Sequence, residues 1–305
     1  MIDQDRGGHA LFPPVNVAEI KALACELPCE QNLPFSRFSC SDIAHEAVRR
    51  GVVPSISNTT VWRWLTTDAI KPWLYHSWIF PRDPHFAEKA GRVLDLYQGF
   101  WEGEPLGPKD LVISADEKTS IQARKRLIAT APGTNRCQRV EFEYKREGAL
   151  VYIAAWDVHQ AHLFGLCQKR SGIESFHLLV DLVMQQEPYR SAHRVFWITD
   201  NGSPHRGEKS VHRLSQWYSN ATLVQTPVHA SWLNQIEIYF SVVQRKVLTP
   251  NNFPSLLALE KQLLKFQSYY NTTAKPFKWK FTKENLKGIL KNISSYPLQL
   301  ESSAA

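Results

Sequence analysis

The stretch Pro227-Val228-His229-Ala230-Ser231-Trp232-Leu233-Asn234-Gln235-Ile236-Glu237 is the part of this chain that decides its fold, because it ends in a carboxylate on a predicted helix. Apolar residues recur with helical period between Trp232 and Leu248, and Asn234 and Glu237 lie one turn apart on the face beside them, where both can look into one cleft. Upstream, Asp200 closes an apolar run and is followed by Asn201-Gly202, a pair typical of turns. The pattern predicts an acid at a strand end within reach of an acid on a helix.

A third acid, Asp116, closes the apolar run 111–115, which predicts a buried strand. Each motif alone has an ordinary explanation, since Asp-Asn-Gly is also a plain turn and most helical glutamates are exposed. Alternation places Glu117 on the side of the strand opposite Asp116, and Asp157, at the end of a second predicted strand, is a reserve candidate. Together, three carboxylates from two strand ends and one helix are what a site needs to hold two divalent cations, about 4 Å apart, around a phosphodiester. This set predicts phosphoryl transfer on nucleic acid.

Beyond Lys109 the sequence alternates between strand and helix patterns. Three strands come first, and helix, strand, helix, strand and helix follow. This order predicts an α/β fold, a mixed sheet of the ribonuclease H-like type if the three acids meet, preceded by a small all-α helix-turn-helix domain. The predicted strands cover 111–116, 150–156, 161–167, 194–200 and 222–225, and the helices cover 173–186, 209–219 and 232–248.

Two short helices joined by a turn with Gly51 and Pro54 precede this region. Ser41 is the predicted N-cap of the first helix, and Ser57 or Asn58 that of the second. The pair fits a helix-turn-helix, whose second helix can enter a major groove, although a plain helical hairpin gives the same pattern. The candidate DNA contacts are Asn58, Thr59, Thr60 and Arg63, whereas Val61, Trp62 and Leu65 are candidates for the core.

Changes in pattern along the chain predict four regions. Residues 1–40 form a loosely structured arm, 41–98 a helix-turn-helix region with a linker helix, 109–250 the catalytic domain, and 251–305 a helical, Lys-rich tail. Aromatic residues interleaved with lysines in the tail allow either packing against the sheet or stacking on nucleic acid. Beyond Asp116, a basic segment suits a phosphate path beside a metal site and adds the candidate DNA contacts Arg124, Lys125 and Arg126.

Composition favours a folded protein with a polyanionic partner. Hydrophobic residues make up 43% of the chain, and the formal charge is +7 with a pI near 9.1. The five cysteines are odd in number and scattered, which is typical of reduced thiols in a cytoplasm, and they do not have the spacing of a zinc site. The sequence shows neither a signal-peptide pattern nor an apolar run of membrane-spanning length, so we expect a cytoplasmic location and no membrane partner.

These segments together resemble the DDE transposases of the bacterial insertion-sequence branch of the mariner superfamily. The resemblance extends from about Ser41 to Lys291. Its last motif, the third-acid motif 231–237, is the most specific of the three. The first acid matches Asp116 within 114–119, the second Asp200 within 199–203 and the third Glu237, and the segment 270–277 also resembles that branch.

The resemblance implies a cut-and-paste transposase that acts on double-stranded DNA, both element ends and target, with a homodimer as a candidate assembly. Asp116 and Asp200 would bind the metals directly and Glu237 would complete the second site, with Mg²⁺ as the expected ion and Mn²⁺ as an alternative. One departure from the family is that only the helix-turn-helix at 41–65 is recognisable, where two are usual. A nuclease of the same fold, a regulator without catalysis and an inactive or truncated copy remain alternatives.

Overall fold

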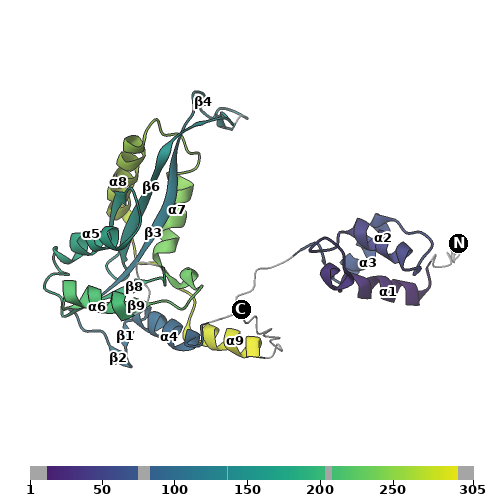
Figure 1. Cartoon of the computed structure of the whole chain (residues 1–305), viewed down its shortest axis with the longest axis horizontal. Coiled ribbons are helices and arrows are strands. Elements are labelled where there is room, and N and C mark those ends of the chain that lie inside the picture. The colour runs from purple at the N-terminus through teal and green to yellow at the C-terminus, as the bar shows by residue number, and fades with distance from the viewer. Residues whose placement is uncertain (1–11, 75–82, 136, 203–207, 295–305) are drawn as a thin grey trace, which may run out of the picture. The chain divides into compact units, whose positions relative to one another are not determined.

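The computed structural model describes residues 12–74, 83–135, 137–202 and 208–294, which form two compact units divided between Ile79 and Phe80. Figure 1 shows the helical N-terminal unit and the larger unit built on a sheet. Parts of the predicted arm (1–11) and tail (295–305), and Ser203 of the second acid motif, lie outside the described residues. Within those residues no helix is long and apolar enough to cross a lipid bilayer.

Three helices pack around one core in the N-terminal unit. They are α1 (Pro14–Ala24), α2 (Cys40–Arg49) and α3 (Asn58–Thr67). Ser39, not Ser41, caps α2, because Asp42 completes a reciprocal capping box with it. Ser57 caps α3 by accepting a hydrogen bond from the backbone of Thr60 at 3.1 Å.

The prediction of a loosely structured arm over 1–40 is wrong for its described part. Helix α1 buries Ile20 and Leu23 completely or nearly so, against the same core that receives Ile43 of α2 and Val61 of α3. Two short helices alone bury too little apolar surface to be stable, and the third helix closes their open face. The helix-turn-helix is thus part of a three-helix domain.

The larger unit contains a five-stranded mixed sheet, which confirms the predicted α/β, ribonuclease H-like class. Its order is β7-β6-β3-β8-β9. The first three strands pair antiparallel, and β8 and β9 run parallel to β3. The strands are β3 (Asp110–Lys125), β6 (Lys145–Asp157), β7 (Leu163–Gln168), β8 (Arg194–Thr199) and β9 (Ala221–Gln225).

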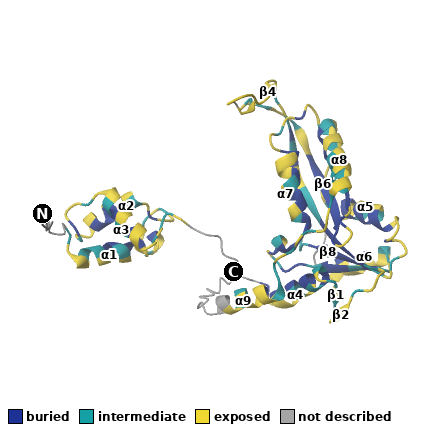
Figure 2. Ribbon diagram, turned by 180° about the vertical axis from the view of Figure 1, so that it is seen from behind, coloured by how far each residue is buried: buried dark blue, intermediate teal, exposed yellow. Residues whose placement is uncertain are grey.

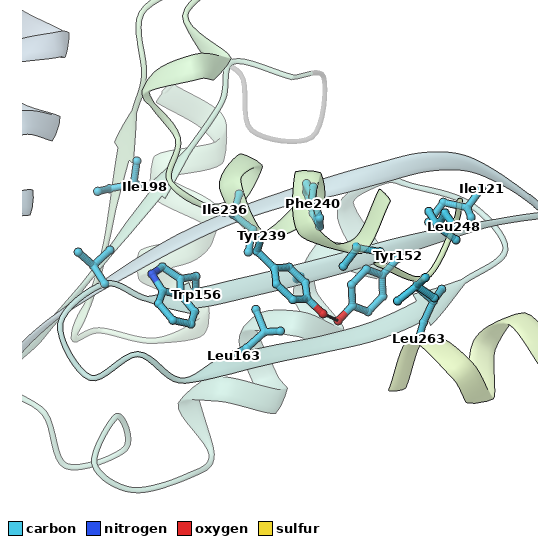
Figure 3. Packing of buried hydrophobic residues seen from close by; sticks show 14 of the residues in the cluster. Ile121, Tyr152, Trp156, Leu163, Ile198, Ile236, Tyr239, Phe240, Leu248 and Leu263 are labelled. Atoms are coloured by element: carbon cyan, nitrogen blue, oxygen red, sulfur yellow. Dashed lines mark hydrogen bonds between the residues drawn. The ribbon is translucent and has the colours of Figure 1, made fainter. Parts of the chain in front are cut away.

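Helices cover both faces of this sheet, so its central strands are apolar on both sides. Helices α7 (Ile236–Lys246) and α8 (Leu256–Thr273) pack on the face of Val112, and α5 (Ile173–Met184) and α6 (Glu208–Trp217) pack on the face of Ile113. Figure 2 shows the exposed outer sides of α7 and α8 in yellow. Within the first core, the hydroxyls of Tyr152 and Tyr239 lie 3.1 Å apart (Figure 3).

Strands β3 and β6 are longer than predicted. Beyond Lys118 they leave the core and continue as a two-stranded ribbon, with register shifts between Lys118 and Ile121 and between Gln122 and Arg124. Ser120 adopts a left-handed conformation at the first shift, with a φ of 56°. A small hairpin of β4 (Ala129–Thr130) and β5 (Arg139–Val140) ends the ribbon. The hairpin is held by cross-strand pairing and not by burial, so its charged sequence has the pattern of a loop.

Helix α4 (Phe86–Tyr97), predicted to belong with the helix-turn-helix region, belongs to the larger unit. It packs beside the short strands β1 (Phe100–Trp101) and β2 (Glu104–Pro105) and against α9 (Lys283–Ser294).

The tail aromatics do not offer free rings for stacking on nucleic acid, so that alternative is wrong for them. Phe277 lies 4.6 Å from the ring of Trp156, and Trp279 lies 5.2 Å from the ring of Tyr97. Phe281 packs on Trp232 at 5.1 Å. The tail packs against the larger unit, which is the other of the two predicted alternatives.

Candidate active site

Asp116 and Asp200 leave neighbouring parallel strands at matching positions. The last registered pair between β3 and β8 is Ser114 with Ile198, so each acid lies two residues further along its strand. Because side chains alternate between faces, both acids follow Ser114 and Ile198 onto the face that α7 covers. The two carboxylates therefore project from one edge of the sheet to the same side.

Glu237 lies in the first turn of α7, which packs on that face through Ile236 and Phe240. Burial, together with the negative charges of Asp200 and Glu237, raises the pKa of Asp116 to about 8. The pKa of Glu237 is also raised, first by burial and also by Asp200, while Lys118 opposes the shift. The three carboxylates thus lie close enough to affect one another's pKa.

Local hydrogen bonds fix the two aspartates. Asp200 accepts a hydrogen bond from the backbone amide of Gly202 at 2.8 Å, and Asp116 accepts one from the amide of Glu117 at 2.7 Å. The side-chain amide of Asn201 donates to the carbonyl of Thr226, just beyond β9. Glycine is needed at 202, because a Cβ there would lie 2.8 Å from the Asp200 carboxylate.

A buried polar network attaches the start of α7 to β3. The Ser114 hydroxyl donates to the side-chain carbonyl of Asn234 and accepts from the amide of Ile236 at 2.8 Å. Asn234 also donates to the carbonyl of Ala115 at 2.9 Å. Since these residues flank Asp116 and Glu237 in sequence, the network sets the position of one acid relative to the other.

Asn234 therefore has a different role from the predicted one. The helical period through 232–248 put it on the face of Glu237, looking into a shared cleft, but the segment begins as a short 3-10 turn, η3 (Ser231–Leu233), and α7 starts at Ile236. Asn234 has extended backbone and a fully buried side chain. Tyr97 supports the same turn by donating to the carbonyl of Leu233 at 2.7 Å.

Asp157, the reserve candidate, has a structural role. Its side chain is fully buried and accepts hydrogen bonds from the amides of His159 and Gln160 and from the hydroxyl of Tyr189, at 2.7 Å. These bonds hold the turn between β6 and β7.

Residues that the sequence did not single out also border the acids. A cavity of about 270 Å³ beside Asp200 is lined by Asn201, Thr226 and His229 among others. His229 has a φ of 61°, an uncommon conformation for a residue other than glycine. Ser114 was detectable as the one polar residue within an apolar run, whereas the contribution of His229 depends on a turn that has no sequence signature.

The donor set fits a divalent metal ion. Oxygen-only ligands suit Mg²⁺ and Mn²⁺, and the pKa of Asp116 is raised first by burial and then by the negative charge of Asp200, which a cation would balance. Among the residues that the structure describes, no three His, Cys, Asp or Glu side chains converge on one point. The acids therefore fit a site in which fewer than three of these side chains bind each ion, and water or phosphate oxygens supply its other ligands.

The candidate contacts on α3 divide by exposure. Asn58, Thr59 and Arg63 are exposed, whereas Thr60 is half-buried and its hydroxyl lies 2.8 Å from that of Ser57. Trp62 was predicted to be core but is 52% exposed. The cause is its position in the helical period, because Val61 and Leu65, one turn apart, already fill the buried face.

The three basic candidates on β3 divide in the same way. Arg124 and Arg126 line a cavity next to Lys118, whereas Lys125 lines a different cavity with Glu141. Alternation along the strand separates Lys125 from its two neighbours.

Comparison with known proteins supports this description. Residues 112–260 match the family described as "DDE superfamily endonuclease", and no curated protein matches the chain. Among solved structures, the fold resembles the "Mos1 transposase paired-end complex with left transposon end" and the "Mos1 mariner paired end complex with Mn". The TM-scores are 0.57 and 0.59, each at 14% identity and covering 97% of this chain and 83% of the other. The "Mos1 Strand Transfer Complex" matches with a TM-score of 0.56 at 14% identity, covering 96% and 82%.

Proposed function

From the match of residues 112–260 to the family described as "DDE superfamily endonuclease", we propose that this protein is a DNA transposase that cuts and joins the ends of an insertion element. The observation that carries the proposal is the common register of Asp116 and Asp200 on parallel strands, with Glu237 on the helix that covers them. The motifs around these acids favour the bacterial insertion-sequence branch of the mariner superfamily.

Asp116, Asp200 and Glu237 would hold Mg²⁺, or Mn²⁺ in its place. Bound there, such ions lower the pKa of an attacking water and stabilise the leaving 3′-oxygen. The protein's part is to hold the three carboxylates in place: β3 and β8 fix the aspartates, the amide of Gly202 orients Asp200, and the Ser114 network holds the start of α7. These are rigid elements, as a preorganised site requires.

Two reactions share this site in the proposed mechanism. In the first, water attacks the phosphodiester at the element end, the bond between phosphorus and the 3′-oxygen breaks, and a 3′-hydroxyl is released. In the second, that hydroxyl takes the place of the water and attacks a target phosphodiester, and the leaving group is a strand end of the target. Both are in-line displacements, so neither needs a covalent bond to the protein.

The N-terminal unit would recognise the element ends. Helix α3 presents Asn58, Thr59 and Arg63 to solvent near its start, where a recognition helix contacts base edges in a major groove. Thr60 and the basic residues of β3 were predicted contacts too, and the overall charge of +7 favours DNA. The related Mos1 structures are paired-end complexes, so we propose that two copies of this chain pair two ends, at the nucleoid of a bacterial cytoplasm.

The test is a Mg²⁺-dependent cleavage and strand-transfer assay on DNA carrying the sequences that flank this reading frame. Wild type is compared with Asp200→Asn, which preserves the shape of the side chain and removes its charge. Cutting and joining by wild type alone would establish the proposed function. Cutting without joining would identify a nuclease of the same fold, and binding without either reaction would identify a regulator or an inactive copy.

A further inference from the structure

A basic groove runs beside the three acids. It has a volume of about 410 Å³ and lies between β3 and the end of α7. We use the name basic groove for the cavity lined by Lys118, Gln122, Arg124, Arg126, Gln244 and Asn251 with their immediate neighbours.

The floor of the basic groove is fixed by side-chain bridges to the strand. Asn251 donates to the carbonyl of Gln122 at 2.7 Å and accepts from the amide of Arg124 at 3.0 Å. Asn252 accepts from the amide of Arg126 at 3.0 Å. These bonds satisfy the free edge of β3 where β8 no longer accompanies it, so the basic side chains are presented from a rigid backbone.

The positive charge in the basic groove is not neutralised by the protein. Within the described ranges, no carboxylate forms an ion pair with Lys118, Arg124 or Arg126. The guanidinium groups of both arginines lie over the ring of Tyr144, at 4.7 and 5.2 Å. One nitrogen of Arg126, Nη1, is buried and has no hydrogen-bond partner among the described residues.

The basic groove shares strand β3 with Asp116 and helix α7 with Glu237. Lys118 follows Asp116 by two residues and points to the same face of β3. On the other wall, Gln244 lies two turns beyond Glu237 on α7, on the same side of the helix.

We propose that the basic groove binds the phosphate backbone of one DNA strand adjacent to the phosphodiester that is cut. Arg124 and Arg126 contact phosphates through charged hydrogen bonds, and Lys118 contacts the phosphate nearest the acids. Gln244 and the hydroxyls of Thr119 and Ser120 supply neutral donors along the same path. This assignment rests on the proposed function, because it takes DNA as the substrate.

A single strand fits the basic groove better than a duplex. Its volume is in the range of sites that enclose small ligands, and a duplex could only lie across its mouth. Lys125 is on the opposite side of the ribbon, so it is not part of this site although it is adjacent in sequence. The groove therefore predicts different effects for three consecutive basic residues.

The experiment measures binding of a short single-stranded oligonucleotide to the full chain by fluorescence anisotropy across a salt series. Arg124→Ala/Arg126→Ala should bind about tenfold more weakly, with a salt slope smaller by about 1.4, the value for two lost contacts to a single strand. Arg124→Lys/Arg126→Lys keeps both charges and should retain most of the slope. Lys125→Ala should have a much smaller effect than Arg124→Ala.

The matched control is Lys261→Ala/Lys265→Ala, which removes two charges from the exposed side of α8. Equal losses in the two alanine pairs would mean that net charge alone attracts DNA and would overturn the proposal, as would wild-type affinity in the groove pair. Circular dichroism and thermal unfolding verify the fold of every variant. If wild type binds the oligonucleotide through the basic groove but never cuts DNA, the proposed function is wrong and the assignment of the groove is retained. If wild type cuts DNA and the groove variants bind normally, the assignment of the groove is wrong and the proposed function is retained.

Discussion

The hydroxyl of Ser114 donates a hydrogen bond to the side-chain carbonyl of Asn234, and both side chains are fully buried. Ser114 lies two residues before Asp116, and Asn234 lies three residues before Glu237. One hydrogen bond thus connects the elements that carry two of the three acids, although neither polar residue reaches the cleft.

Ser114→Ala should lower the free energy of unfolding by about 2 kcal/mol, because the buried carbonyl of Asn234 and the amide of Ile236 lose their partner. Urea denaturation measures the change. Ser268→Ala, on the exposed side of α8, is the control and should change the stability by less than about 0.5 kcal/mol. Equal stability of wild type and Ser114→Ala would show that the network contributes nothing.

Gly202→Ala should reduce DNA cleavage at least tenfold while leaving DNA binding intact. A methyl group at 202 would approach the Asp200 carboxylate to 2.8 Å and displace it. Gly288→Ala is the control, since a Cβ there meets nothing within 4 Å and α9 should tolerate it. Normal cleavage by Gly202→Ala would mean that the position of Asp200 is not critical.

Asp200→Asn should abolish cleavage and leave the affinity for DNA largely unchanged, because the acid contributes charge to the site and not to the DNA contacts. Gel-shift and cleavage assays on the same DNA separate the two effects. A variant that still cuts would remove Asp200 from the catalytic set.

Lowering the pH should weaken the interaction between Asp110 and Arg194, the first paired residues of β3 and β8. Arg194 forms two hydrogen bonds with Asp110, at 3.0 and 3.1 Å, and holds the pKa of that carboxyl at about 2. Because the folded pKa is below the unfolded value of about 3.9, the stabilisation is complete above pH 4 and is lost as the pH falls towards 2. Asp110→Asn should therefore cost about 2 kcal/mol at pH 7 and almost nothing at pH 2, as measured by urea denaturation at both pH values. A cost that does not vary with pH would exclude the charge as its source.

Trp62→Ala should leave the stability of the N-terminal unit within about 0.5 kcal/mol of wild type, because the side chain is half exposed. Leu65→Ala, which opens a cavity in the core, should cost about 3 kcal/mol. Thermal unfolding of the two variants gives the comparison, and similar losses would place Trp62 in the core after all.

The acids and the sheet were predictable because local sequence determines them. Asp116 and Asp200 each close an apolar run, and such a run marks the buried part of a strand. Strand β8 does end just before Asp200, whereas β3 continues past Asp116 to Lys125, so the prediction that Asp116 ends a strand is wrong. The parallel alignment of those two strands then follows from the helical connections between them.

Other features depend on contacts between distant residues. Periodicity alone could not show that the segment at Asn234 is a 3-10 turn, because the alternative is decided by Ser114 and Tyr97, far away in sequence. The role of helix α1 depends on distant residues too: the sequence has a short helical pattern around 17–27, but its prolines and weak periodicity indicate a loose arm until α2 and α3 provide a core. The ribbon beyond Lys118 is held by its partner strand, which a single charged segment does not reveal.

Strand β3 carries Asp116 in its buried half and Arg124 in its ribbon half. Strand β3 pairs with β6 both before and after its two register shifts, so one ladder holds the backbone at Asp116 and at Arg124. If the basic groove binds the backbone of the DNA, β3 sets the distance between the phosphates that the arginines contact and the phosphodiester that is cut. Inserting or deleting residues in this strand would then move the cut along the DNA before it abolished cutting.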